Sequence, residues 1–229
     1  MLTADRICKL SIASMLFVYQ LYTAFFGVLE PYKQVAYHLL FILPLSFLMY
    51  PLKTRGQKWM MVLNYGLVTL SIATFVLIVY DFDAYITRVR EYDITRLDYV
   101  IAFAGTLLIL EAARRSLGLP LVLITAAFLF YALAGHIFQG FLRHRPFSIE
   151  QVLVSIFMGP AGIFGIPLIV CATIIFMFIA FGALLQTTGV SDYFITLANY
   201  FTGNSYGGPA KAAVISSSLM ATISGSAVA

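Results

Sequence analysis

Charged residues are scarce in this 229-residue sequence: they make up 10% of it, whereas soluble domains contain about 25%. Hydrophobic residues make up 61%, and the mean hydropathy is +0.93. A chain this apolar cannot cover a surface that faces water, so we expect lipid to surround it. The sequence also lacks a long polar region, which excludes a separate soluble catalytic domain.

Cysteine and histidine are rare as well. Cys8 and Cys171 lie far apart in apolar runs without CxxC spacing, so we interpret them as packing residues. His38, His136 and His144 form no metal-ligand spacing, and we assign none of them a catalytic role. Paired carboxylates, a nucleophile–base set and a GxxxxGK[ST] motif are all missing, which argues against a membrane enzyme and an ATP-driven pump. We therefore expect no enzymatic activity and no organic cofactor.

The formal net charge is +4, and the basic residues stand in small groups at the ends of apolar runs. Membrane proteins place lysine and arginine in this way because these residues meet lipid headgroups and set orientation. The charge therefore indicates a membrane protein and argues against nucleic-acid binding.

Six apolar runs approach the roughly 20 residues that a helix needs to cross a hydrocarbon core about 30 Å thick. We predict an all-α, polytopic membrane protein with about six transmembrane helices, near residues 7–29, 35–50, 60–80, 99–115, 119–138 and 168–185. The first run is too long for a signal peptide and has no small-x-small cleavage site, so we expect a retained anchor.

Polar stretches separate these runs. Residues 81–98 mix acidic and basic side chains, which predicts a solvated surface loop that can include a short amphipathic turn. Ser148 begins a pattern typical of a short interfacial amphipathic helix that ends near Phe157. Glycines and prolines in residues 159–167 then interrupt any helix, and a polar turn at 186–192 precedes a helical piece that reaches Tyr200.

The distribution of basic residues determines orientation only weakly. With a cytoplasmic N-terminus, seven lysines and arginines fall in inside links and six in outside links. The compact basic groups directly at helix ends favour the cytoplasmic N-terminus.

The last segment differs from the rest, because 15 of the 23 residues from Gly207 to Ala229 are Gly, Ala, Ser or Thr. Close packing between helices accounts for such a composition. Ser224-Gly225-Ser226 fits a second explanation equally well. A helix broken inside the membrane exposes carbonyl and hydroxyl oxygens that can replace the hydration shell of a small cation.

Two pairs of motifs carry a resemblance to a known family. GGPAK at Gly207–Lys211, followed by ISGSAVA at Ile223–Ala229, resembles the start of the large membrane subunit of TRAP (tripartite ATP-independent periplasmic) transporters. LEAARRSLG at Leu110–Gly118 and GIFGIP at Gly162–Pro167 are similar to the fused permeases of the TAXI type. In those permeases a four-helix small subunit is joined to a large subunit of about twelve helices.

The resemblance implies a permease of a bacterial or archaeal cytoplasmic (inner) membrane. It would import a carboxylate-type solute, driven by a sodium gradient and delivered by a periplasmic binding protein. It divides the chain into a small-subunit-like domain (1–118), a connecting helix and loop (119–146) and the start of the large-subunit transport domain (147–229). Because more sequence follows this motif in the family, we expect a fragment or truncated product that cannot transport alone.

By the same resemblance, Ser224, Gly225 and Ser226 match the first re-entrant hairpin, which helps to bind sodium and substrate. Gly207, Gly208, Pro209 and Lys211 would form that hairpin or line the solute path. Lys211 has an alternative role, in which it reaches the membrane interface as an ordinary lysine.

Glu111, Arg114 and Arg115 lie at i, i+3 and i+4, where the carboxylate can pair with either arginine on one helix face. We interpret them as a clamp at the cytoplasmic interface rather than as transport residues. A different class of function stays open for the whole chain, namely a structural or assembly subunit that holds a partner and moves nothing.

Overall fold

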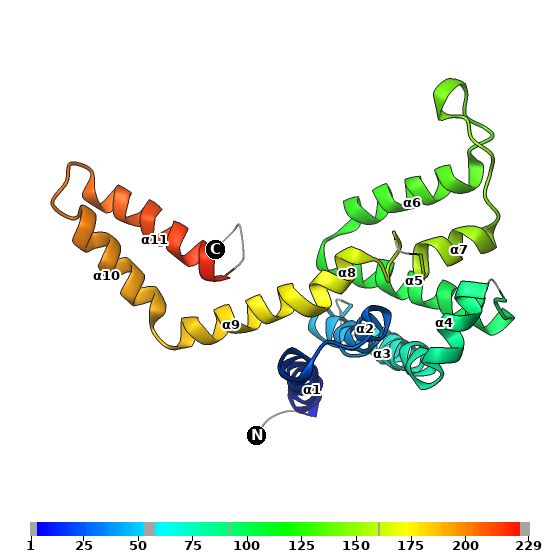
Figure 1. Ribbon diagram of the computed structural model, residues 1–229, viewed down its shortest axis with the longest axis horizontal. Coiled ribbons are helices and arrows are strands. Elements are labelled where there is room, and N and C mark those ends of the chain that lie inside the picture. Colours follow the sequence, from blue (N-terminus) through cyan, green and yellow to red (C-terminus); the bar gives the residue numbers. More distant parts are fainter. Residues whose placement is uncertain (1–3, 53–57, 92, 160, 225–229) are drawn as a thin grey trace. The chain divides into compact units, whose positions relative to one another are not determined.

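The computed structural model describes residues 4–52, 58–91, 93–159 and 161–224, and the regular elements in those residues are all helical (Figure 1). The prediction of an all-α fold is therefore confirmed. The chain divides into two compact units, one formed by residues 1–19 and 28–169 and the other by residues 20–27 and 170–229.

Three helices, α2 (Pro31–Met49), α3 (Lys58–Tyr80) and α5 (Arg96–Ser116), pack against one another in the first unit. Helix α2 begins where the side chain of Glu30 accepts a hydrogen bond of 3.0 Å from the Lys33 N–H. Its buried face repeats every four residues at Val35, Leu39 and Leu43, which places the apolar stripe against α3 and α5. This bundle provides the packed core of the first unit.

Three helices in the described part of the chain are long and apolar enough to cross a membrane, and they cover Asp5–Phe26 (within α1, Ala4–Phe26), Trp59–Tyr80 and Ile166–Thr187. Helix α6 (Leu119–Ala134) is apolar but shorter. The multi-pass prediction is therefore confirmed, and each of the six expected ranges contains helix. It stays a prediction that α2, α5 and α6 also cross the bilayer.

The expectation of a solvated loop at residues 81–98 is wrong for most of that segment. Residues Phe82–Glu91 form helix α4, which buries Phe82 and Tyr85 against the bundle. Helix α5 then begins at a capping box, in which the Thr95 side chain accepts from the Asp98 N–H and the Asp98 side chain accepts from the Thr95 N–H. Arg88 pairs with Asp81 and Asp98, and these ion pairs join α4 to the ends of the neighbouring helices.

Helix α7 (Ile149–Phe157) begins after Ser148 and ends at Phe157, as the sequence predicts. Its capping box uses Gln151 rather than the neighbouring Glu150. Within the predicted break, the Ile163 N–H donates to the Ile156 carbonyl at 2.6 Å, which turns the chain back along the end of α7. That the helix lies in the membrane interface stays a prediction.

The most apolar of the three candidate spans consists of α8 (Ile166–Val170), a π-helical stretch, η2 (Cys171–Ile175), and α9 (Phe176–Thr187), and it belongs to the second unit from Val170 onward. The expected polar turn after it is short, because Gly189 takes a left-handed conformation (φ +83°) and α10 (Val190–Thr202) starts at once. Helix α11 (Gly208–Ser224) packs back along α10, so that the two form a helical hairpin (Figure 1).

Candidate functional site

The hairpin of α10 and α11 contains the residues that the resemblance connects with transport. Gly207 ends the turn with φ +72°, a backbone conformation that residues other than glycine rarely adopt. A Cβ on Gly208 would lie 2.5 Å from the Thr202 carbonyl oxygen and 2.8 Å from the Gly203 carbonyl oxygen. Both distances are shorter than an ordinary van der Waals contact. Thr202 is buried, and its hydroxyl contacts the carbonyls of Ala198 (2.7 Å) and Gly208 (3.3 Å). The two glycines thus let α10 and α11 approach closely at the turn.

Lys211 stands on the first turn of α11 with its side chain exposed. Its Nζ donates to the Ser205 hydroxyl at 3.4 Å, which keeps the ammonium group beside the turn of the hairpin. This position is compatible with both expected roles, a lysine at an interface and a counter-charge for a carboxylate.

Ser224 is the last residue of α11, and Gly225 and Ser226 lie outside the described residues. Along the helix before it, three hydroxyl groups already donate to carbonyls of their own helix, those of Ser216, Ser218 and Thr222. Hydroxyls bound in this way support a packing role for this stretch. A cation site built from free oxygens therefore stays a prediction for Ser224, Gly225 and Ser226.

Glu111, Arg114 and Arg115 come together at the C-terminal end of α5. Arg114 binds both carboxylate oxygens of Glu111 (2.7 and 2.8 Å), and Arg115 Nε donates to one of them at 2.8 Å. Arg115 is only 4% exposed, and its Nη1 donates to the Asn64 side chain (2.5 Å) and approaches the Tyr50 carbonyl (3.4 Å). We call these five residues the Arg115 cluster; it ties α5 to the end of α2 and the start of α3.

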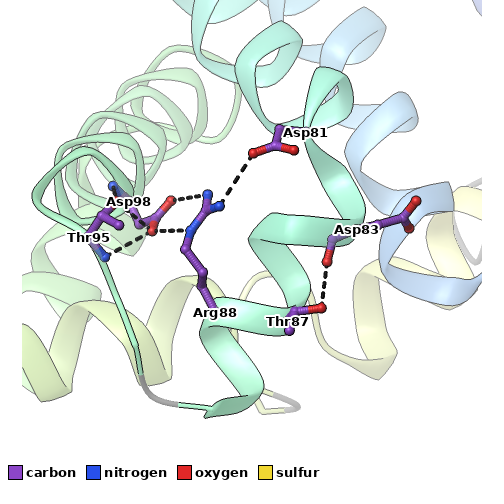
Figure 2. A network of polar contacts seen from close by, with 6 residues as sticks. All are labelled: Asp81, Asp83, Thr87, Arg88, Thr95 and Asp98. Atoms are coloured by element: carbon purple, nitrogen blue, oxygen red, sulfur yellow. Dashed lines mark hydrogen bonds and ion pairs between the residues drawn. The ribbon is translucent and has the colours of Figure 1, made fainter.

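A second group of charges, shown in Figure 2, lies at the N-terminal end of α5. The guanidinium of Arg88 binds both oxygens of Asp98 at 2.9 and 3.0 Å and reaches Asp81 at 3.3 Å. The Thr95 hydroxyl donates to Asp98 at 2.7 Å. We call Asp81, Arg88, Thr95 and Asp98 the Asp98 cluster; it joins α4 to the ends of α3 and α5.

Asp98 is the buried member of this cluster, with 1% of its surface exposed, and it precedes the apolar run of α5. Burial alone would raise the pKa of Asp98, but hydrogen bonds from Arg88 and Thr95 outweigh burial and hold the pKa below its usual value. The hydrogen bond to Asp98 likewise raises the pKa of Arg88 above its ordinary value. The pair therefore stays charged at neutral pH, which suits a structural ion pair.

The two clusters lie at opposite ends of the same bundle. From Asp98 to Arg115 the helix rises about 26 Å at 1.5 Å per residue, close to the roughly 30 Å of a hydrocarbon core. The sequence predicted the pairing of Glu111 with the arginines but missed Asn64, Arg88 and Asp98. The spacing Thr95-x-x-Asp98 is a sequence signal for the start of α5. No short sequence pattern predicts the contact of Arg115 with Asn64, because the two residues are 51 positions apart.

The first unit also contains an open cavity of about 800 Å³. Its walls come from α4, the start of α5 and α7, and they combine apolar side chains such as Ile86 and Val154 with the charged Arg90 and Glu150. Within the described residues, no group of three or more histidine, cysteine or acidic side chains could hold a metal ion.

Comparison with known proteins bears on the same region. The family described as "Tripartite ATP-independent periplasmic transporter, DctM component" matches residues 104–229, which is more than half of the chain. The matched part begins inside α5 and includes α6, α7 and the whole α10–α11 hairpin. Neither a curated protein nor a solved structure matches the chain.

Proposed function

Because the chain belongs to the DctM family of tripartite ATP-independent periplasmic (TRAP) transporters, we propose that it forms part of a sodium-coupled permease that imports a carboxylate-type solute. The observation that carries the proposal is the family match over the α10–α11 hairpin, which leads directly to Ser224-Gly225-Ser226. Secondary transporters bind coupling ions where a helix is interrupted inside the membrane, because the unwound carbonyls are free to coordinate them. The coupling ion in this proposal is sodium, and the permease uses no organic cofactor.

The solute reaches the permease from a periplasmic binding protein, in keeping with a tripartite system. In this proposal the end of the bundle with the Asp98 cluster faces the periplasm, and the N-terminus and the Arg115 cluster face the cytoplasm of a bacterial or archaeal cell. Residues 1–118 then correspond to the small subunit, residues 119–146 to the connection and residues 147–229 to the start of the transport domain. The bundle of α2, α3 and α5 lies within residues 1–118, the part that this proposal assigns to the small subunit.

Two groups of residues have separate roles in the proposed site. Hydroxyl and carbonyl oxygens of Ser224, Gly225 and Ser226 coordinate sodium and help to hold the solute. Gly207 and Gly208 allow the hairpin turn, and the ammonium group of Lys211 attracts the carboxylate toward it.

Uptake by the intact permease in proteoliposomes tests this proposal. The permease is reconstituted with its binding protein and supplied with ¹⁴C-labelled succinate, 2-oxoglutarate or glutamate, with and without an inward sodium gradient. We expect the gradient to increase uptake of one of these carboxylates at least about tenfold, and Ser226→Leu to abolish the increase because it removes a sodium ligand.

Ser218→Ala is the matched control, because the Ser218 hydroxyl already donates to the Val214 carbonyl within α11. It should leave sodium-dependent uptake within about twofold of the unaltered permease, since that hydroxyl is not free to bind an ion. An uptake rate that changes neither with the sodium gradient nor with Ser226→Leu would contradict the proposed mechanism.

A further inference from the structure

The open cavity of the first unit has walls that are largely aliphatic. Ile86 and Val89 line it from α4, and Val154 and Met158 line it from α7 and its C-cap. These four side chains are buried or half-buried. The volume of about 800 Å³ is the size of an organic ligand's site rather than that of a few water molecules. Such walls favour a ligand that contains hydrocarbon.

Two opposite charges border the same cavity, Arg90 from α4 and Glu150 from the first turn of α7. The side chain of Arg90 is exposed, and its one ion pair with a described residue is a long contact of 3.9 Å with Glu30. Glu150 is exposed and forms no ion pair within the described part of the chain. Both charged groups can therefore bind a ligand.

The signs of these charges determine which headgroup fits. A guanidinium binds phosphate oxygens, and a carboxylate accepts hydrogen bonds from an ammonium group. The charges of Arg90 and Glu150 cancel, and Glu30 adds a second carboxylate beside Arg90, so a zwitterion fits better than an anion. A quaternary ammonium has no N–H to donate, so a carboxylate favours a primary ammonium over choline.

Further polar groups in the walls are hydrogen-bond donors. The side-chain oxygen of Gln151 already accepts from the Ser148 N–H at 3.1 Å, which leaves the NH2 group of that side chain for a ligand. Tyr32 and Tyr99 line the cavity as well and carry hydroxyl groups. Donors of this kind match the ester oxygens of a glycerolipid.

The cavity lies where the apolar part of α5 begins. Tyr99 lines it and directly follows the buried Asp98, and residues 99–110 contain no charged side chain. At the start of α7, Phe147 and Ile149 expose apolar side chains beside the charged Glu150. In a bilayer-spanning α5, this level is the one at which lipid headgroups meet acyl chains, and tyrosine collects there.

We propose that this cavity binds one zwitterionic phospholipid with a primary ammonium group, of the phosphatidylethanolamine type. Arg90 binds its phosphate, Glu150 accepts from its ammonium group, and the first part of the acyl chains lies against Ile86, Val89 and Val154. The rest of the chains extends from the open side of the cavity into the bilayer. The site consists of residues of the first unit alone and does not depend on the proposed transport activity.

Native mass spectrometry of the full chain tests this site. The protein is delipidated in detergent and mixed with dioleoyl phosphatidylethanolamine, phosphatidylcholine or phosphatidylglycerol. We expect one phosphatidylethanolamine molecule to bind about tenfold more tightly than either of the other lipids, the size of one charge-assisted hydrogen bond.

Three substitutions separate this site from general lipid contact. Arg90→Gln should weaken phosphatidylethanolamine binding about tenfold, because the phosphate loses its cation. Glu150→Lys should reverse the preference toward phosphatidylglycerol, because the cavity then carries two positive charges. Arg96→Gln is the matched control and should change nothing, since Arg96 is an exposed arginine at the same end of α5 that does not line the cavity. The thermal midpoint of each variant shows that it is folded.

Val154→Trp fills the cavity without changing its charge and should also weaken the binding of phosphatidylethanolamine. Equal binding of the three lipids, or binding that Arg90→Gln and Val154→Trp both leave unchanged, would mean nonspecific lipid contact and would overturn the proposal. The same insensitivity is expected if the cavity instead receives a side chain of a partner protein.

Discussion

Arg114 and Arg115 are neighbours of the same residue type that bind the same carboxylate, yet their surroundings differ. The side chain of Arg114 is 41% exposed and contacts Glu111 alone among the described hydrogen bonds. The side chain of Arg115 is 4% exposed, stands over the ring of Phe47 at 4.9 Å, and also donates to Asn64. An exposed ion pair contributes little to stability, whereas removal of one partner of a buried pair leaves uncompensated polar groups.

Substitution of these two arginines gives a matched comparison. Arg115→Gln should destabilise the protein by about 2–3 kcal/mol, because Glu111 and Asn64 lose a buried donor. Arg114→Gln should cost less than about 1 kcal/mol, because water replaces the lost contact. Thermal unfolding in detergent micelles measures both. Equal losses for the two variants would show that Arg115 does not connect the helices in the way that its contacts indicate.

At the scale of elements, the contact of α5 with α7 depends on one glycine. The ring of Phe157 lies against Gly105 and is fully buried between the rings of Phe75 and Phe164, with centroids 6.4 and 5.3 Å away. A side chain at residue 105 would overlap the Phe157 ring, and the flanking aromatic rings leave that ring little room to move. The end of α7 is thus fixed by packing, while its beginning is fixed by the capping box of Ser148 and Gln151.

Alanine at two helical glycines tests this contact. Gly105→Ala should destabilise the protein by about 1–3 kcal/mol, because the added methyl overpacks the aromatic cluster. Gly66→Ala is the control in α3, where a Cβ meets nothing within 4 Å, and it should be neutral or stabilising by up to about 1 kcal/mol.

The thermal midpoint of each variant in the same detergent gives the comparison. Combining Gly105→Ala with Phe157→Leu should recover part of the loss, because leucine is smaller than the ring it replaces. A Gly105→Ala protein as stable as the Gly66→Ala protein would mean that α7 moves away from α5 without cost.

At the scale of the whole molecule, the first unit has charged clusters at both ends of its bundle. The helical stretches between them (34–49, 59–80 and 99–110) contain no Asp, Glu, Lys or Arg. Near the Asp98 cluster, Lys33 Nζ stands over the ring of Phe82 at 5.4 Å, so the start of α2 lies at the same end. At the other end, the Arg115 cluster joins the end of α2 to the start of α3. Such a distribution matches a bilayer, in which charged groups collect at the two interfaces.

Cysteine labelling in cells tests the proposed orientation, in which the N-terminus and the Arg115 cluster face the cytoplasm. In a protein with Cys8→Ala and Cys171→Ala, Phe141→Cys should react with a membrane-impermeant maleimide from the periplasm, because Phe141 is 96% exposed in the loop after α6. Leu117→Cys, between α5 and α6, should react only after the membrane is permeabilised. The reverse pattern would invert the topology, and reaction of both from one side would show that α6 does not cross.

The sequence alone determined the membrane character, the helical class, the limits of α7 and the family, because these depend on composition, local periodicity and short motifs. Hydrophobic length predicts a helix in lipid whatever its neighbours are, and GGPAK needs no partner to be identified. The same local reasoning failed at residues 81–98, where mixed charge normally indicates a solvated loop.

Only the tertiary structure decided which polar groups meet. Arg88 of α4 binds Asp98 of α5, and Arg115 binds Asn64, which lies 51 residues away in the sequence. The ring of His144 contacts the backbone carbonyl of Tyr131 in α6. These contacts depend on how helices pack side by side, since periodicity within one helix does not specify which residue of another helix lies opposite. Burial then determines how much each contact contributes to stability, because loss of the partner leaves a buried charge uncompensated, whereas water solvates an exposed charge.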